Sequence, residues 1–142
     1  MATILVVDDE PTVRQVIGDI LTDEGYRVVL VANGREGLAA LTTIVMDLVL
    51  CDLMMPVMDG VAFVTALRGQ ERTRDMPVIL MSAVREQNSL AQTSYTAFLE
   101  KPFSITSLLA AVDDVFMGRT RPSDAPFTLL GNDLPDAPTP AA

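Results

Sequence analysis

Residues 4–10 read ILVVDDE, an apolar run that passes directly into acidic side chains. A short apolar run without polar alternation is typical of a strand that is buried on both faces. Four later stretches have the same character, the last of them more weakly: residues 28–31, 48–51, 78–81 and 97–99. The pattern therefore predicts five strands, each with both faces buried.

Helical periodicity separates these runs. Apolar residues share one helical face in two clear segments: Val13, Val16, Ile17, Ile20 and Leu21, and then Ile105, Leu108, Leu109, Val112 and Phe116. Weaker helical patterns include Leu38 and Leu41, then Phe63, Val64 and Leu67, and the polar stretch 85–93 has the least regular one. Strands that alternate with helices form right-handed crossovers, which require a parallel sheet with helices on both faces. We therefore expect a doubly wound α/β domain.

The composition excludes several kinds of site. The 142 residues include no histidine and one cysteine, Cys51, which rules out imidazole metal sites, Ser-His-Asp triads, Cys-His dyads and an internal disulfide. No stretch approaches the ~18 apolar residues of a membrane span, and the first ten residues lack the features of a signal peptide. We therefore expect a cytoplasmic protein with no membrane insertion. The net charge of −9 repels nucleic acid phosphates, which argues against direct nucleic acid binding.

The periodic pattern stops near the carboxyl terminus. We expect one domain over residues 1–118, followed by a flexible, proline-rich tail over residues 119–142, with prolines at 122, 126, 135, 138 and 140. The tail also contains Phe127, Leu129, Leu130 and Leu134. These side chains are compatible with a docking motif or with a partly collapsed terminus.

Polar side chains follow four of the predicted strands. Asp8 and Asp9 follow the first, Asp52 the third, Ser82 the fourth and Lys101 the fifth. In parallel sheets function collects at the carboxyl ends of the strands. If the first and third strands are neighbours, the carboxylates converge, and each ionised pair at ~4 Å repels by about 4 kcal/mol. Mg²⁺, which prefers oxygen ligands and often lies between carboxylates and a phosphate, would relieve this repulsion.

Each of these residues also has a purely structural interpretation. The acids before Pro11 are compatible with helix capping, Asp52 with a turn before Pro56, and Asp59-Gly60 with the cap of the next helix. Ser82 is compatible with a cap as well, and Cys51 with a small buried apolar side chain. Lys101 is the only lysine in the chain. An isolated ammonium among arginines favours a site for a point charge beside phosphate.

Together these residues resemble the receiver domain of bacterial two-component response regulators, the CheY-like family. The resemblance covers residues 2–117 and rests on four segments in order: ILVVDDEPTVR, DLVLCDLMMPVMDG, Ser82-Ala83 and Lys101-Pro102-Phe103. It implies a five-stranded parallel sheet of order 2-1-3-4-5. It also implies that the Lys101-Pro102 peptide is cis.

The resemblance implies a role for each pocket residue. Asp52 would accept a phosphoryl group from a sensor histidine kinase or a histidine phosphotransfer protein, which agrees with the absence of histidine from this chain. Asp8, Asp9, Asp52 and the backbone carbonyl of Met54 would hold Mg²⁺ or Mn²⁺. Lys101 would pair with the phosphoryl oxygens. Phosphoryl transfer depends mainly on positioning and on electrostatic stabilisation, so no separate base is required.

The resemblance also implies an output. Ser82 and Phe98 would form a conformational switch that acts on a downstream protein target. Phe98 shares a strand face with Thr96 and Glu100, so we expect it to be half exposed. Met54 and Val84 lie where the family tunes attack by water on the acyl phosphate. Both are apolar here, and we predict slow dephosphorylation.

One departure from the family concerns residues 83–100. This stretch is about one helical turn, ~3–4 residues, shorter than is usual in the family, and the usual Ala-Gly-Ala before the fifth strand is missing. The departure affects the surface that the family commonly uses for output and dimerisation. We therefore transfer no partner geometry, and a homodimer stays open.

Three functions compete at this point. The favoured one is a stand-alone, phosphorylatable receiver that catalyses only its own phosphorylation and dephosphorylation and signals through protein contacts. The second is a Mg²⁺-dependent phosphohydrolase with Asp52 as nucleophile; Met54, in place of a second acid, and the lack of a cap domain argue against it. The third is a phosphorylation-independent interaction module, which is disfavoured because every pocket position has a competent residue.

Overall fold

The structure, a computed structural model, describes residues 1–83 and 94–118. Its strands are β1 (Thr3–Val7), β2 (Arg27–Val31), β3 (Leu48–Asp52), β4 (Val78–Ser82) and β5 (Ala97–Glu100). Its helices are α1 (Pro11–Asp23), α2 (Gly34–Thr43), α3 (Gly60–Arg68), the short 3₁₀ helix η1 (Glu71–Thr73) and α5 (Ile105–Phe116). The predicted helical stretch 85–93, Val84 and the tail from residue 119 lie outside the described residues.

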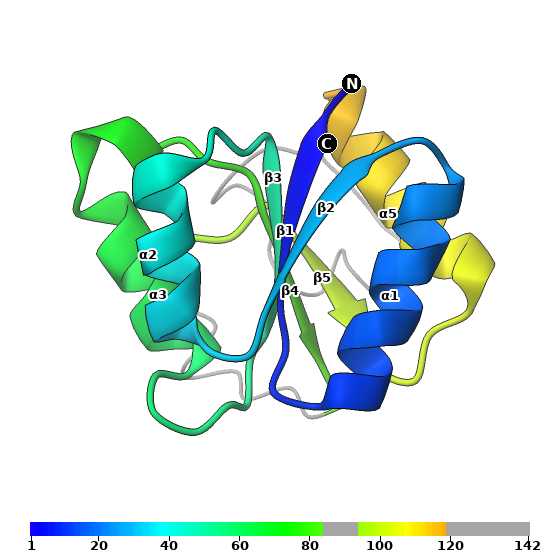
Figure 1. Cartoon of the computed structure of the whole chain (residues 1–142), viewed down its shortest axis with the longest axis horizontal. Coiled ribbons are helices and arrows are strands. Elements are labelled where there is room, and N and C mark those ends of the chain that lie inside the picture. Colours follow the sequence, from blue (N-terminus) through cyan, green and yellow to red (C-terminus); the bar gives the residue numbers. More distant parts are fainter. Residues whose placement is uncertain (84–93, 119–142) are drawn as a thin grey trace, which may run out of the picture.

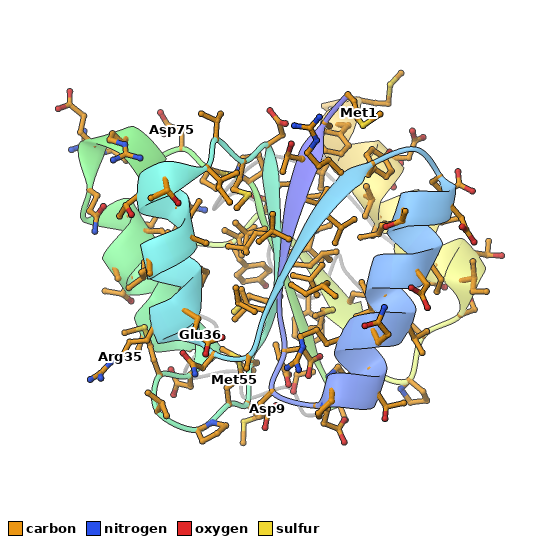
Figure 2. The ribbon with its side chains drawn as sticks, viewed as in Figure 1. Met1, Asp9, Arg35, Glu36, Met55 and Asp75 are labelled. Carbon is orange, nitrogen blue, oxygen red and sulfur yellow. The ribbon has the colours of Figure 1, made fainter. Side chains whose placement is uncertain are left out.

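The strands form one parallel sheet of order β2-β1-β3-β4-β5, which confirms the predicted topology. Helices α1 and α5 cover one face and α2 and α3 cover the other (Figure 1). The apolar side chains accordingly form two layers, one on each side of the sheet (Figure 2). Among the residues that the structure describes, no helix has the length and apolar character needed to cross a membrane.

Burial of the strands follows their place in the sheet. Every residue of β1, β3 and β4 is buried, as the continuous apolar runs predict. The prediction is wrong for β2, whose residues are exposed or only partly buried. β2 lies at one edge of the sheet, where one side has no neighbouring strand, but this position alone does not account for its exposure, because β5 at the other edge is buried at Ala97, Phe98 and Leu99.

The expected half exposure of Phe98 is also wrong. Phe98 is 5% exposed and belongs to the same buried cluster as Phe63 and Leu80. Its neighbour on that strand face, Thr96, is buried too, because its Oγ1 accepts a hydrogen bond from the Val78 amide at 3.0 Å. Thr96 on this face therefore reflects a bond to the adjacent strand, whereas Glu100, at the end of β5, is exposed.

Candidate functional site

The parallel strands bring the predicted polar residues to one edge of the sheet. Val7 pairs with Cys51, so Asp8 and Asp52, which follow them, lie on neighbouring strands. Ser82 ends β4 and pairs with Glu100, and Lys101 follows β5 directly. Figure 2 shows Asp9 at this carboxyl edge and Met1 at the opposite end of the molecule.

Three carboxylates form the centre of the site. Asp8, Asp9 and Asp52 each offer one oxygen, and these oxygens all lie within 4.8 Å of one another. Asp8 is fully buried and Asp52 is 6% exposed, while Asp9 is the more accessible of the three. Carboxylate oxygens are the ligands that Mg²⁺ prefers. The chemistry and spacing of this donor set therefore fit a hard divalent cation.

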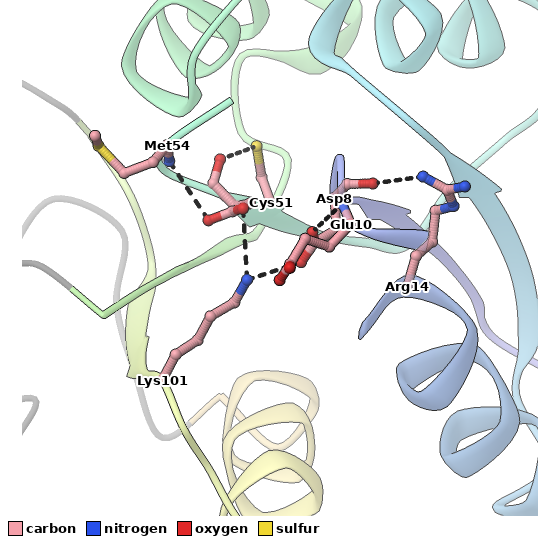
Figure 3. Close-up of polar contacts among 7 residues, drawn as sticks. Asp8, Glu10, Arg14, Cys51, Met54 and Lys101 are labelled. Carbon is pink, nitrogen blue, oxygen red and sulfur yellow. Dashed lines mark hydrogen bonds and ion pairs between the residues drawn. The ribbon is translucent and has the colours of Figure 1, made fainter. Parts of the chain in front are cut away.

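Lys101 supplies positive charge to the same cluster (Figure 3). Its Nζ lies 2.9 Å from Asp8 Oδ2 and 3.4 Å from Asp52 Oδ2. Burial lowers the pKa of the Lys101 ammonium, but the hydrogen bond to Asp8 and the charges of Asp52 and Asp8 outweigh burial and leave the pKa above its ordinary value. The side chain is therefore a fixed cation across the neutral pH range.

A backbone hydrogen bond anchors Lys101 to the neighbouring strand. Its amide donates to the Ser82 carbonyl at 2.9 Å, which ties the end of β5 to the end of β4. The following Lys101-Pro102 peptide is cis, as the family resemblance implies. Ser82 itself is 2% exposed.

Asp52 has an unusual protonation equilibrium. Burial raises the pKa of its carboxyl group from 3.8 to about 6, with a further contribution from the negative charge of Asp8. The Lys101 charge and the Met54 amide, which donates to Asp52 Oδ1 at 3.4 Å, act in the opposite direction and only partly offset the increase. Asp52 is thus a carboxylate in a site that disfavours its charge, and a bound cation would relieve that cost.

The structure separates the acids that cap helices from those that do not. Asp59 caps α3, because its side chain accepts from the Ala62 amide at 2.8 Å. Glu10 is the residue at the cap position of α1, but its side chain makes no capping bond. Asp8 Oδ1 instead accepts from the Glu10 amide at 2.9 Å, within the loop before the helix. Helix capping therefore explains Asp59 but does not explain the acids before Pro11.

Gly60 lets the loop after Asp52 fold back on the strand end. A Cβ at Gly60 would lie 2.8 Å from the Leu53 Cα and 2.9 Å from the Asp52 carbonyl oxygen, distances that no side chain can occupy. The Gly60 amide donates to the Leu53 carbonyl at 2.9 Å, which closes the loop. The start of α3 thus packs directly against the backbone of Asp52. The Asp59-Gly60 pair indicated the cap of the next helix, but not this close approach.

Val57 in the same loop carries backbone strain. Its φ is 73°, a value that a β-branched residue rarely adopts, and the Met58 amide donates across it to the Pro56 carbonyl at 2.8 Å. Its side chain is 71% exposed, so burial does not offset the strain. We expect Val57→Gly to raise the free energy of unfolding by about 1 kcal/mol, because glycine adopts this φ freely.

Chemical denaturation of Val57→Gly and Val45→Gly would test this expectation. Val45 is 86% exposed and is not among the positive-φ residues of the described chain, so it is a matched control. Its replacement should lower the free energy of unfolding by roughly 0.5–1 kcal/mol through the added freedom of the unfolded chain. Equal destabilisation by the two substitutions would contradict the assignment of strain to Val57.

The remaining predicted residues lie around this centre. Met54 is 54% exposed beside Asp52, whereas Phe98 pairs with Leu80 in the interior of the β4–β5 ladder. Val84 lies outside the described residues. Residue patterns did not identify Arg14, whose Nη1 donates to the Asp8 carbonyl at 2.7 Å. The available signal was a cation in the first turns of a helix, where the helix dipole disfavours positive charge.

Comparisons with known proteins agree on one family. Residues 4–113 match the model of the response regulator receiver domain. The chain is 33% identical over 115 residues to the DNA-binding dual master transcriptional regulator RpaA of Synechocystis, which covers 79% of this chain and 48% of RpaA. It is also 33% identical over 117 residues to the probable chemotaxis protein CheY of Rhizobium etli, which covers 80% of this chain and 91% of that protein.

A solved structure is similar in fold and carries a metal. It is the receiver domain of the sensor histidine kinase PA1611 from Pseudomonas aeruginosa, with a magnesium ion coordinated in its active site cleft. Its TM-score is 0.74 at 31% identity, over 82% of this chain and 98% of that one. The present chain spans about half the length of regulators such as RpaA.

Proposed function

Since the chain belongs to the response regulator receiver domain family of two-component signalling, we propose that Asp52 accepts a phosphoryl group from a histidine of another protein. The observation that carries this proposal is the convergence of three carboxylates, within 4.8 Å of one another, on a lysine whose Nζ is 2.9 Å from Asp8 and 3.4 Å from Asp52. The donor would be a sensor histidine kinase or a histidine phosphotransfer protein, because this chain contains no histidine.

The transfer is a displacement at phosphorus. An Asp52 carboxylate oxygen forms the new O–P bond, the P–N bond of the donor phosphohistidine breaks, and the imidazole retains the electron pair and takes up a proton. Lys101, beside Asp52 Oδ2, stabilises negative charge on the transferred oxygens. Asp8, Asp9, Asp52 and the backbone carbonyl of Met54 would hold Mg²⁺ or Mn²⁺. The ion supplies positive charge that stabilises the transferring phosphoryl group.

The surface beside the pocket supports a protein donor. An apolar cavity of about 380 Å³ adjoins Lys101 and is lined in part by Val13, Val16 and Phe103. Val16 is 50% exposed, so the face of α1 beside this cavity presents an apolar side chain to solvent. A donor helix that packed on this surface would carry its histidine next to Asp52.

The proposed output is a phosphorylation-dependent change in protein contacts. Ser82 and Phe98 would form the switch, with the Ser82 hydroxyl moving to the new phosphoryl oxygen and Phe98 responding on the next strand. Similarity to CheY over 91% of the Rhizobium etli protein supports a receiver that acts without an attached output domain. The same proposal includes a receiver domain over residues 1–118, a tail over residues 119–142 and a downstream protein target, and it leaves the homodimer open.

The direct test uses a small-molecule phosphodonor, acetyl phosphate, and intact mass measurement. In Mg²⁺ the wild-type chain should gain the mass of one phosphoryl group. When EDTA removes the metal, the phosphorylated fraction should be at least about 10-fold lower. Peptide mapping should place the group on Asp52. No gain of mass in Mg²⁺ would contradict the proposal and favour a phosphorylation-independent interaction module.

We also expect slow loss of the phosphoryl group. Met54 and Val84 are apolar side chains that cannot orient a water for attack on the acyl phosphate, so Met54→Asn combined with Val84→Glu should shorten the phosphorylated half-life at least ~10-fold. The measurement is the decay of the phosphorylated mass after the donor is removed. An unchanged decay rate would show that these side chains do not control hydrolysis.

A further inference from the structure

Arg14 binds the backbone of a metal-site residue from outside the carboxylate cluster. Its guanidinium Nη1 donates to the Asp8 carbonyl oxygen at 2.7 Å, in a partly buried contact between α1 and the end of β1 (Figure 3). The two carboxylate oxygens of Asp8 are engaged as well. Oδ1 accepts from the Glu10 amide and Oδ2 from Lys101, each at 2.9 Å. Arg14 therefore completes a set of bonds that holds every oxygen of Asp8.

The bond to the carbonyl bears on Asp9 as well as on Asp8. The Asp8 carbonyl and the Asp9 amide belong to one planar peptide unit. A hydrogen bond that fixes the carbonyl oxygen therefore also fixes the orientation of the peptide that leads into Asp9. The Asp8 amide continues the ladder to the Val31 carbonyl at 3.2 Å, while the carbonyl on its other side is bound by Arg14. Strand pairing and Arg14 thus hold the two ends of the residue that precedes Asp9.

The position of Arg14 is unfavourable for the helix itself. α1 begins at Pro11, so Arg14 lies close to its positive end, where the dipole disfavours a cation. α1 has no acidic residue in its first turn to offset this charge. Glu10, at the cap position, is the nearest acid before the helix, but the hydrogen bond of the Arg14 guanidinium goes to the Asp8 carbonyl, beside three carboxylates.

We propose that Arg14 is a positioning residue for the metal, which orients the Asp8-Asp9 peptide so that both carboxylates face Asp52. The inference rests on the proposed function, because it assumes that these acids bind Mg²⁺. The positive charge of Arg14 opposes cation binding, but the side chain is partly exposed and its charge is screened. The geometric effect therefore dominates, since residues that orient metal ligands typically change metal affinity by about 10–100-fold.

The test is calorimetric titration of the unphosphorylated full chain with MgCl₂. Arg14→Ala should raise the Kd for Mg²⁺ at least about 10-fold. Arg14→Lys, which keeps the charge and can donate an N–H to the same carbonyl, should recover part of the affinity. Arg72→Ala is the matched control, because Arg72 Nη2 also donates to a backbone carbonyl, that of Leu41, at the same 2.7 Å, in a contact between η1 and α2. Its Kd should stay within about twofold of wild type, a change too small to indicate a lost ligand contact.

Stability is measured in EDTA alongside the titration. If Arg14→Ala does not fold, Arg14→Lys and Arg14→Gln take its place, and a several-fold weaker Kd in a folded variant supports the inference. An unchanged or tighter Kd in Arg14→Ala overturns it, as does equal weakening by Arg72→Ala. If the wild type itself does not bind Mg²⁺, the proposed function fails together with this inference. Equal affinity of wild type and Arg14→Ala overturns the inference alone.

Discussion

Asp52→Asn should abolish phosphorylation by acetyl phosphate in Mg²⁺, with a loss of at least about 100-fold in the rate of mass gain. The amide replaces a carboxylate oxygen that must form the bond to phosphorus, and its nitrogen is not nucleophilic. The labelled fraction is read by intact mass at fixed times.

Asp59→Asn is the control for this experiment. Asp59 is close to Asp52 along the chain, but its side chain caps α3 through the Ala62 amide, a bond that asparagine can also make. This variant should be phosphorylated at the wild-type rate. Equal labelling of wild type and Asp52→Asn would refute Asp52 as the acceptor, and loss of labelling in Asp59→Asn would show that the assay reports disruption of the loop.

The second large effect concerns stability without metal. The pKa of Asp52 is raised from 3.8 to about 6 in the folded protein, mainly by burial. The folded state therefore binds this proton more tightly than the unfolded state does. The contribution of Asp52 to the free energy of unfolding is complete below pH 4 and is lost as the pH rises through 6. The difference amounts to about 3 kcal/mol at neutral pH, since each pKa unit is worth about 1.4 kcal/mol.

Asp52→Asn removes the buried charge and should eliminate this loss. We expect wild type and variant to have similar unfolding free energies near pH 4, and the variant to be more stable by up to about 3 kcal/mol at pH 8 in EDTA. Urea denaturation at several pH values measures the difference, and Asp59→Asn should follow the wild-type profile. A stability gap that stays constant with pH would contradict the raised pKa of Asp52.

Mg²⁺ should reduce the difference in unfolding free energy between the wild type and Asp52→Asn. A cation that binds the folded wild type stabilises it by mass action and offsets the repulsion among the carboxylates. Asp52→Asn lacks one of the proposed metal ligands, so Mg²⁺ should stabilise it less than it stabilises the wild type. Repeating the urea series with excess MgCl₂ therefore measures metal binding independently of phosphorylation.

Much of the fold was predictable from local pattern. Continuous apolar runs predicted the strands, because a strand buried on both faces needs apolar side chains at every position. The alternation with helical faces predicted the parallel sheet, because crossovers have one hand. Burial of individual residues was less predictable. β2 was expected to be buried and Phe98 half exposed, and both were wrong because burial depends on what packs against a strand.

Residue chemistry predicted that Asp8, Asp9, Asp52 and Lys101 lie together at the candidate site, as the structure shows. The acids that follow two of the apolar runs, and the single lysine that follows another, can be read from the sequence. Parallel topology brings the carboxyl ends of the strands to one edge of the sheet. Only the folded chain decided how these groups contact one another: Lys101 bridges Asp8 and Asp52, and Arg14 binds the Asp8 carbonyl. These contacts join residues far apart in the chain or across a loop, at separations set by register and packing. Composition and periodicity contain no information on such distances, and that is why the raised pKa of Asp52 and the bond from Arg14 to the Asp8 carbonyl emerged only from the tertiary structure.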